Sequence, residues 1–415
     1  MGSKIENNNM NFLKVKKYLT LPITKTKFNY FSKKIFKFYT ENDLFFNVPF
    51  YFGKTISNNN SSIKNCTSVI NFNFLKNLRD YQIKCVENLL LNLRQNSSCI
   101  LSCYTGFGKT VVALYIVSKL NLPVLITVPR VQLLDQWNAE IEFFLGESPI
   151  KLTSQNKYFF DIQKYKIALI NVTNLDKVAN KEIFKFVIID EVHLQMTENI
   201  CHKLINLQPD YLLGISATPY RTDDCNCLFS LFFGDGKVEE ELFHEHTVFR
   251  IDTGYKPNLI LNKNGIDWNN VLEEQSSNVP RNNLIVKLCL DNKNRNILIL
   301  TRRINQAEYI YDLLVKNNEL VSRFFGKYNE DDSGRIIIGT TSKIGTGFNC
   351  KKLNMLIVAG DMMSYYKQFL GRVMREKNNN PIIFDLVDND SLLISHFNER
   401  CKIYRTHGGK IIYQK

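Results

Sequence analysis

Apolar and polar positions alternate in two ways along most of the chain. Short, continuously apolar segments recur, and the stretches between them carry apolar residues at helical spacing, as in VQLLDQWNAEIEFFL. The apolar segments of the first series are ILSC (100–103), VLITVP (124–129), IALINV (167–172), FVIID (186–190) and YLLGIS (211–216). Continuously apolar strands separated by helices indicate a parallel sheet covered on both faces. We therefore predict an α/β domain from about residue 76.

The same alternation returns nearer the C-terminus. The second series consists of NILILT (296–301), RIIIGT (335–340), MLIVAG (355–360) and PIIFDLV (381–387). Between the two series the pattern is lost over residues 235–280, which indicates the end of one domain and a connector. The predicted organisation is an N-terminal accessory region (1–75), a first α/β domain (76–250), a connector (251–280), a second α/β domain (281–405) and a tail (406–415).

Residues 1–75 interleave lysines with aromatic residues. Nine lysines and one acidic residue, Glu6, fall within residues 1–40. Two interpretations are open. A basic arm with stacking side chains would bind nucleic acid, whereas a small folded accessory domain would bury its Phe and Tyr residues and keep its lysines outside. We favour the folded domain, followed by a linker over residues 57–68, which are rich in Asn and Ser.

The composition is that of a globular protein with an excess of positive charge. Hydrophobic residues make up 44% of the 415 residues, and the formal net charge is +13. This charge favours a polyanionic partner, although a bias toward A/T-rich codons would also supply lysines. No apolar run is long enough for a membrane span, so we expect neither a transmembrane helix nor a signal segment. Ten scattered cysteines without zinc-finger spacing fit a reducing compartment, so a cytoplasmic location is expected.

A glycine-rich loop lies in the stretch ILSCYTGFGKT, which runs from a strand into a helix, as a phosphate-binding loop must. Gly106 and Gly108 allow the backbone to approach phosphates, and the helix N-terminus favours anions. Lys109 would contact the β- and γ-phosphates and Thr110 would bind Mg²⁺. Because Cys103 stands where the usual motif has glycine, the loop alone leaves an ordinary turn as the alternative.

Two further strands end in polar side chains. In VIIDEVH, Asp190 lies where a Mg²⁺-holding carboxylate is needed, and Glu191 would orient or deprotonate a water. A capping pair is the alternative. In GISATPYR, Ser216 and Thr218 end another strand, at the sheet edge where ligands bind. A simple turn before Pro219 is the alternative there.

Two arginines in QFLGRVMR, Arg372 and Arg375, are three residues apart on a predicted helix and so share a face. An arginine finger contributes roughly 10³ to 10⁵ in rate. An ordinary basic helix surface is the alternative, and it would be favoured if the first domain held no nucleotide site.

In this order the motifs resemble those of superfamily 2 helicases, over about residues 78–388. LRDYQ resembles the adenine-reading segment, CYTGFGKT motif I, DEVH motif II, SAT motif III, IIIGTTSKIGTGFN motif V and QFLGRVMR motif VI. DEVH is typical of the DExH branch. The resemblance implies two tandem RecA-like domains of the α/β class, parallel sheets flanked by helices, that hydrolyse ATP with Mg²⁺ in the cleft between them.

The resemblance also assigns roles to single residues. The catalytic residues it implies are Lys109, Asp190, Glu191, Gln368, Arg372 and Arg375. The implied nucleotide-binding residues are Arg79, Gln82, Thr105, Gly106, Phe107, Gly108, Lys109, Thr110, Gly347 and Asn349, with Gln82 reading the base and Thr110 and Asp190 holding Mg²⁺. The implied coupling residues are His193, Ser216 and Thr218. The implied contacts to nucleic acid are Arg130, Thr173, Thr301, Arg302 and Thr341. Trp137 is expected to be a core residue.

Neighbouring strings, among them VPRVQLLDQW, VPRNNLI and GTGFN, resemble the poxvirus-type transcript-release helicases of large cytoplasmic DNA viruses. That family comprises DNA-dependent ATPases and 3′-to-5′ DNA helicases of viral transcription termination. It implies DNA as the substrate, with RNA or a hybrid as alternatives, and RNA polymerase or transcription factors as partners. It also implies a monomeric motor without membrane contact, in a viral factory or virion.

Besides Cys103, two positions depart from the family pattern. Phe369 stands where many relatives have Arg, and Asn349 stands where Asp is common. Asn349 can bond a ribose hydroxyl but carries no charge. The alternatives left open are a repair or restriction-type duplex translocase, and a nucleic-acid-binding scaffold with weak ATPase activity.

Overall fold

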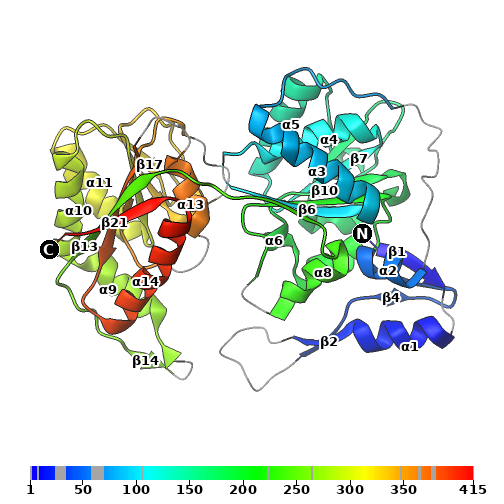
Figure 1. Ribbon diagram of the computed structural model, residues 1–415, viewed down its shortest axis with the longest axis horizontal. Coiled ribbons are helices and arrows are strands. Elements are labelled where there is room, and N and C mark those ends of the chain that lie inside the picture. The colour runs from blue at the N-terminus through cyan, green and yellow to red at the C-terminus, as the bar shows by residue number, and fades with distance from the viewer. Residues whose placement is uncertain are drawn as a thin grey trace. The chain divides into compact units, whose positions relative to one another are not determined.

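The computed structural model describes residues 2–6, 9–23, 34–57, 70–104, 106–221, 224–262, 265–345, 348, 350–362, 366–374 and 380–414. The chain forms two compact units (Figure 1). One unit consists of Met1–Cys103 and Phe107–Glu240, and the other of Tyr104–Gly106 and Glu241–Lys415. Among the described residues, no helix combines the length and the apolar character that a membrane crossing requires.

The first unit is built on a seven-stranded sheet in the order β12-β6-β11-β10-β7-β9-β8, in which every ladder is parallel. Its strands are β6 (Ser98–Cys103), β7 (Val124–Val128), β8 (Ile150–Lys151), β9 (Ile167–Asn171), β10 (Phe186–Ile189), β11 (Tyr211–Ser216) and β12 (Lys237–Glu240). The central strands are buried on both faces, as their continuously apolar sequences predict.

Helices cover both faces of this sheet. They are α3 (Asp80–Asn96), α4 (Lys109–Leu120), α5 (Gln132–Leu145), α6 (Val192–Gln195), α7 (Glu198–Ile205) and α8 (Cys227–Phe233). Figure 1 shows α3, α4 and α5 on one side of the sheet and α6 and α8 on the other. Side chains alternate along a strand, so Val187 and Ile189 of β10 pack with the α6–α8 side.

The N-terminal region adds a further layer to the first unit. Its elements are β1 (Gly2–Glu6), α1 (Asn9–Tyr18), β2 (Thr20–Ile23), β3 (Lys34–Lys37), β4 (Thr40–Glu41), β5 (Phe45–Pro49) and α2 (Phe50–Ser57). Strands β1, β5 and β4 form an antiparallel sheet, and β2 pairs with β3. Phe38, Phe46 and Phe50 are buried in one core with Phe232 and Phe233 of α8. These three aromatic residues are therefore core, as the folded interpretation expects, but they share the core of the first unit, whereas Phe12 and Tyr18 are exposed.

The second unit has its own seven-stranded parallel sheet, in the order β17-β18-β16-β19-β20-β13-β21. Its strands are β13 (His246–Asp252), β16 (Ile297–Thr301), β17 (Val321–Phe324), β18 (Ile336–Thr340), β19 (Met355–Val358), β20 (Ile382–Val387) and β21 (Gly409–Gln414), beside the short pair β14 (Leu261–Asn262) and β15 (Gly265–Ile266). Its helices are α9 (Trp268–Ser277), α10 (Val279–Asp291), α11 (Ile304–Lys316), α12 (Thr341–Ile344), α13 (Tyr366–Val373) and α14 (Ser391–Thr406). Helices α10 and α11 pack on one face and α13 and α14 on the other.

The units divide at places that differ from the sequence-based boundaries. Strand β13 begins before residue 250 but pairs with β20 and β21, so it belongs to the second sheet. The expected connector contains α9 and the start of α10, and the expected tail contains β21. Strands β13 and β21 lie in the chain before and after the main βα series of the second sheet. Their sequences carry no local sign of which sheet they join, which explains the difference.

Candidate nucleotide-binding site

The glycine-rich loop connects the end of β6 to the start of α4. Gly106 and Gly108 have φ of 95° and 91°, a backbone conformation that side chains with a Cβ rarely adopt. At Gly108 a Cβ would lie 2.6 Å from Nε2 of Gln82, so a side chain here would displace the amide that holds the loop. The backbone is therefore left bare at the helix N-terminus, as anion binding requires. Thr105, assigned to the same loop, lies outside the described residues.

Gln82 fastens this loop to the start of α3. Its Nε2 donates to the carbonyl of Phe107 at 2.8 Å, and its Oε1 accepts from the backbone N–H of Arg79 at 3.0 Å. The Arg79 guanidinium donates to the hydroxyl of Tyr81, whose ring packs 5.2 Å from that of Phe107. Gln82 thus holds the loop through contacts of its own, and its role in reading a base stays a prediction.

Lys109 is the first residue of α4, and Thr110 follows it in the first turn. The Lys109 ammonium donates to the carbonyl of Cys103 at 2.9 Å, so the side chain points back to the end of β6. Cys103 is 1% exposed, and burial raises the pKa of its thiol. The non-glycine residue at this position is therefore an inert part of the core.

Asp190 and Glu191 follow directly after β10. Glu191 has a φ of 46°, a strained conformation for a residue other than glycine, and its N–H donates to Oδ1 of Asp190 at 2.9 Å. Burial, and then the neighbouring charge of Glu191, raise the pKa of Asp190 to about 7, against the opposing effects of Trp137 and Lys109. Strained backbone and a raised carboxylate pKa are typical of a functional site.

The second oxygen of Asp190 accepts from the indole of Trp137. The Trp137 Nε1 lies 2.9 Å from Oδ2 of Asp190, and the side chain is 3% exposed. The sequence predicts a core residue at this position, which is correct for the ring, but it does not indicate the hydrogen bond. These two residues are 53 apart in the chain, and only the pairing of β7 with β10 brings them together.

His193 links the loop after β10 to the end of β11. Its Nδ1 lies 2.8 Å from the Ser216 hydroxyl, which also accepts from the backbone N–H of Thr218 at 3.0 Å. The guanidinium of Arg221, a residue that the sequence analysis did not single out, donates to the His193 carbonyl at 2.8 Å. Burial, with the charges of Arg221 and Lys109, lowers the pKa of His193 to about 4, so the imidazole is neutral near pH 7.

These residues share one edge of the first sheet because adjacent strands bring their carboxyl ends together. The loops after β6, β11 and β10 carry the glycine-rich loop, Ser216 and Asp190, and those strands are consecutive in the sheet. Further along the same edge, Arg130 follows β7 and Thr173 follows β9, and both are exposed. The two nucleic-acid candidates of this unit therefore lie beside the nucleotide candidates.

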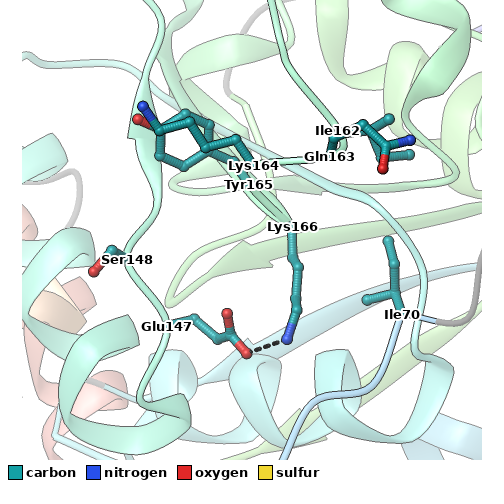
Figure 2. Close-up of a pocket in the computed structure, with 8 residues that line it drawn as sticks. All are labelled: Ile70, Glu147, Ser148, Ile162, Gln163, Lys164, Tyr165 and Lys166. Carbon is teal, nitrogen blue, oxygen red and sulfur yellow. Dashed lines mark hydrogen bonds and ion pairs between the residues drawn. The ribbon is translucent and has the colours of Figure 1, made fainter.

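A cavity of about 470 Å³ lies elsewhere in the first unit (Figure 2). It is lined by Ile70, Glu147, Ser148, Ile162, Gln163, Lys164, Tyr165 and Lys166. Figure 2 shows the ion pair between Lys166 and Glu147, whose Nζ and Oε1 are 2.5 Å apart. Lys166 precedes β9 and Glu147 precedes β8, so the cavity is at the amino ends of the strands, away from the phosphate loop.

In the second unit, Arg372 is held by its own domain. The side chain is 8% exposed, and its guanidinium donates to the carbonyls of Phe348 and Gly345 after α12. These bonds join α13 to the loop that follows β18 and α12. The finger role of Arg372 stays a prediction. Arg375, Gly347, Asn349 and the side chain of Gln368 lie outside the described residues.

The nucleic-acid candidates of the second unit differ in exposure. Thr301 ends β16 and is fully buried, with its hydroxyl 3.4 Å from the carbonyl of Gly339. Arg302 and Thr341 are half-buried. In this conformation Arg302 and Thr341 can contact a phosphate through their side chains, whereas the Thr301 side chain cannot.

The first part of the chain matches a protein family. The family model described as "Type III restriction enzyme, res subunit" matches residues 75–221. A protein of Invertebrate iridescent virus 6 named "Putative helicase 161L" is 39% identical over 394 residues, which cover 87% of this chain and 88% of that protein. The "Transcript termination protein A18" of Yaba-like disease virus is 24% identical, over 84% of this chain and 81% of that protein.

A solved structure has the same architecture. S. cerevisiae Dbp5 bound to RNA and ADP BeF3 superposes with a TM-score of 0.55 and 13% identity, over 80% of this chain and 89% of that one. At this identity the likeness concerns the fold. Together with the two parallel sheets it confirms the predicted tandem RecA-like domains.

Proposed function

We propose a DNA-directed role for this chain, which belongs to the superfamily 2 DExH-type helicases and is an ATP-hydrolysing enzyme. In our proposal it is a DNA-dependent ATPase that unwinds DNA with 3′-to-5′ polarity and acts in viral transcription termination. The observation that supports it best is the set of side chains at one sheet edge, where Lys109, Asp190 and the His193–Ser216 pair follow adjacent strands.

The residues present fit a nucleotide and Mg²⁺. Gly108, with a φ of 91° and no Cβ, presents bare backbone at the start of α4, and backbone of this kind suits phosphate oxygens. A carboxylate and a hydroxyl are the oxygen donors that Mg²⁺ prefers. Thr110 and Asp190 would hold the ion, which when bound neutralises charge on the phosphates.

The chain's own side chains would act on the phosphates and on the attacking water. Lys109 would leave the Cys103 carbonyl to contact the β- and γ-phosphates. Glu191 would orient or deprotonate the water. Its Oε2 lies 3.4 Å from Nδ1 of His193, which links it to the end of β11. Gln368, Arg372 and Arg375 would stabilise charge that develops during hydrolysis.

Coupling to nucleic acid would pass along the sheet edge. A change at Glu191 or His193 reaches the end of β11 through the hydrogen bond to Ser216. Arg130 and Thr173 lie further along the same edge and would contact the phosphate backbone, as Arg302 and Thr341 would in the second unit. The net charge of +13 supports a polyanionic substrate.

The choice of DNA and of termination rests on similarity. The Yaba-like disease virus relative is named a transcript termination protein, and by extension we propose viral RNA polymerase or its factors as partners of a monomeric motor in the cytoplasm. A second candidate is a duplex translocase of the restriction or repair type, which the family model over residues 75–221 favours.

ATPase assays with and without DNA test the site. Lys109→Ala and Glu191→Gln should each abolish DNA-stimulated hydrolysis while the thermal unfolding profile stays that of the wild type. Lys119→Ala is the matched control, because Lys119 is exposed on the same helix. Retained stimulation in Lys109→Ala or Glu191→Gln would refute the assignment.

Strand displacement tests the substrate and the polarity. Duplexes with 3′ or 5′ single-stranded tails, in DNA and in RNA, are incubated with ATP. Displacement that requires a 3′ DNA tail is expected. ATP hydrolysis stimulated by blunt duplex without displacement would instead support the translocase, and displacement from a 5′ tail would exclude the proposed polarity.

A further inference from the structure

We propose that Trp137 is a positioning residue for ATP hydrolysis, whose indole N–H orients the Asp190 carboxylate that would hold Mg²⁺. The 2.9 Å bond from Nε1 to Oδ2 runs between α5 and the loop after β10. This inference rests on the proposed function, because it needs Asp190 to be the metal-holding group. It adds a residue to the site that the phosphate loop and the carboxylate motif do not contain.

The two oxygens of the Asp190 carboxylate are held by different donors. Oδ1 accepts from the N–H of Glu191 at 2.9 Å, and Oδ2 accepts from Trp137. An ionised carboxylate has about four lone-pair sites, so each oxygen keeps one for a metal ion or a water. One donor on each oxygen fixes the plane of the carboxylate and leaves two of its lone pairs available.

The main chain of Asp190 is already fixed by other groups. Its N–H donates to the Thr127 carbonyl at 3.0 Å, and its carbonyl accepts from Gln195 Nε2 at 2.6 Å. Gln195 is held in turn by the Thr127 hydroxyl and carbonyl. Because the backbone position is secured in this way, what is left is the torsion of the side chain, which Trp137 fixes together with the Glu191 N–H.

A purely structural tryptophan would need only an acceptor for its buried N–H. Here the acceptor is an ionisable carboxylate at the functional edge of the sheet rather than a backbone carbonyl. Partners that orient a ligating group typically contribute 10- to 100-fold to metal affinity or activity. Phenylalanine at position 137 would keep most of the apolar contact and remove the donor, so it separates the two roles.

The first test compares Trp137→Phe with Trp268→Phe, a matched control in α9 of the second unit. We expect Trp137→Phe to raise the Mg²⁺ concentration for half-maximal ATPase activity about tenfold or more. Binding of a fluorescent ADP analogue should be unchanged without Mg²⁺ and weaker with it. A structural defect would instead weaken binding equally in both conditions, and that outcome, like a wild-type Mg²⁺ dependence, overturns the inference.

The second test leaves Trp137 in place. The chain has two tryptophans, so Trp268→Phe makes Trp137 the only indole. Its emission should change when Mg²⁺ is added to the ADP complex, and Asp190→Asn should remove that change. An unchanged emission in the Trp268→Phe protein overturns the inference. If Trp137→Phe does not fold, this fluorescence measurement takes the place of the first test.

Different results would refute the proposed nucleotide site and the positioning role of Trp137. If Lys109→Ala and Asp190→Asn both retain ATPase activity, the proposed site is wrong. If those variants are inactive while Trp137→Phe keeps the Mg²⁺ dependence of the wild type, the site stands and the positioning role is excluded.

Discussion

Replacing Arg372 by alanine should destabilise the second unit as well as stop turnover. The guanidinium is buried and donates to the carbonyls of Phe348 and Gly345. Hydrogen bonds to a charged group contribute about 1.5–3 kcal/mol each, and one buried and one partly buried carbonyl would lose their donor. Because such contributions are not fully additive, we expect a loss of about 3–5 kcal/mol in the free energy of unfolding of this unit.

Urea unfolding followed by tryptophan fluorescence can measure this loss. In a Trp137→Phe background the emission comes from Trp268, which lies on α9 in the second unit. With a urea slope of about 2 kcal/mol per M, a loss of 3 kcal/mol lowers the midpoint by about 1.5 M. Arg405→Ala, an exposed arginine of the same unit, is the control and should leave the midpoint unchanged.

The ATPase activity of Arg372→Ala and Arg405→Ala, measured with Trp137 in place, completes the comparison. If Arg372→Ala abolishes ATPase activity but keeps the midpoint of the wild type, the two carbonyl contacts contribute no stability and the residue acts as a finger alone. The reasoning from burial would then be refuted. If the midpoint falls as expected, part of the activity loss belongs to the misplaced loop after α12.

Three further outcomes follow from the described contacts. Gly108→Ala should abolish nucleotide binding, measured by titration of a fluorescent ADP analogue. The control is Gly254→Ala, which has a positive φ of 70° and open space around it, and which should lower the unfolding free energy by about 1–2 kcal/mol through backbone strain alone. Burial lowers the pKa of His193 to about 4, against 6.5 in the unfolded chain. The folded state therefore loses about 3 kcal/mol of stability as the pH falls from 6.5 toward 4, and none above pH 6.5. His193→Gln should remove that part of the pH dependence of urea unfolding. Arg400→Met should cost about 3–5 kcal/mol in urea unfolding of the second unit, because it removes both 2.8 Å guanidinium bonds to the buried Asp385 carboxylate and leaves that charge with the Tyr404 hydroxyl as a donor. An unchanged midpoint would contradict that cost.

Much of the site could be predicted because its chemistry is local in sequence. The strand, glycine-rich loop and helix N-terminus are contiguous, so Lys109 and Thr110 follow from hydrophobic pattern and residue type. Asp190 and Ser216 follow from one further rule, that the carboxyl ends of parallel strands meet at one edge. Even Cys103, the departure from the usual loop, proves to be a core position that does no chemistry.

Contacts between distant segments needed the tertiary structure. The bond from Trp137 to Asp190 and the burial of Arg372 depend on which strands are neighbours and on how a side chain turns. The assignment of β13 and β21 to the second sheet is of the same kind. By itself, the sequence determined the elements and the motifs, because periodicity and turn residues act over a few positions. The tertiary structure decided the partners of each side chain, because strand order and packing bring together segments that no local pattern connects.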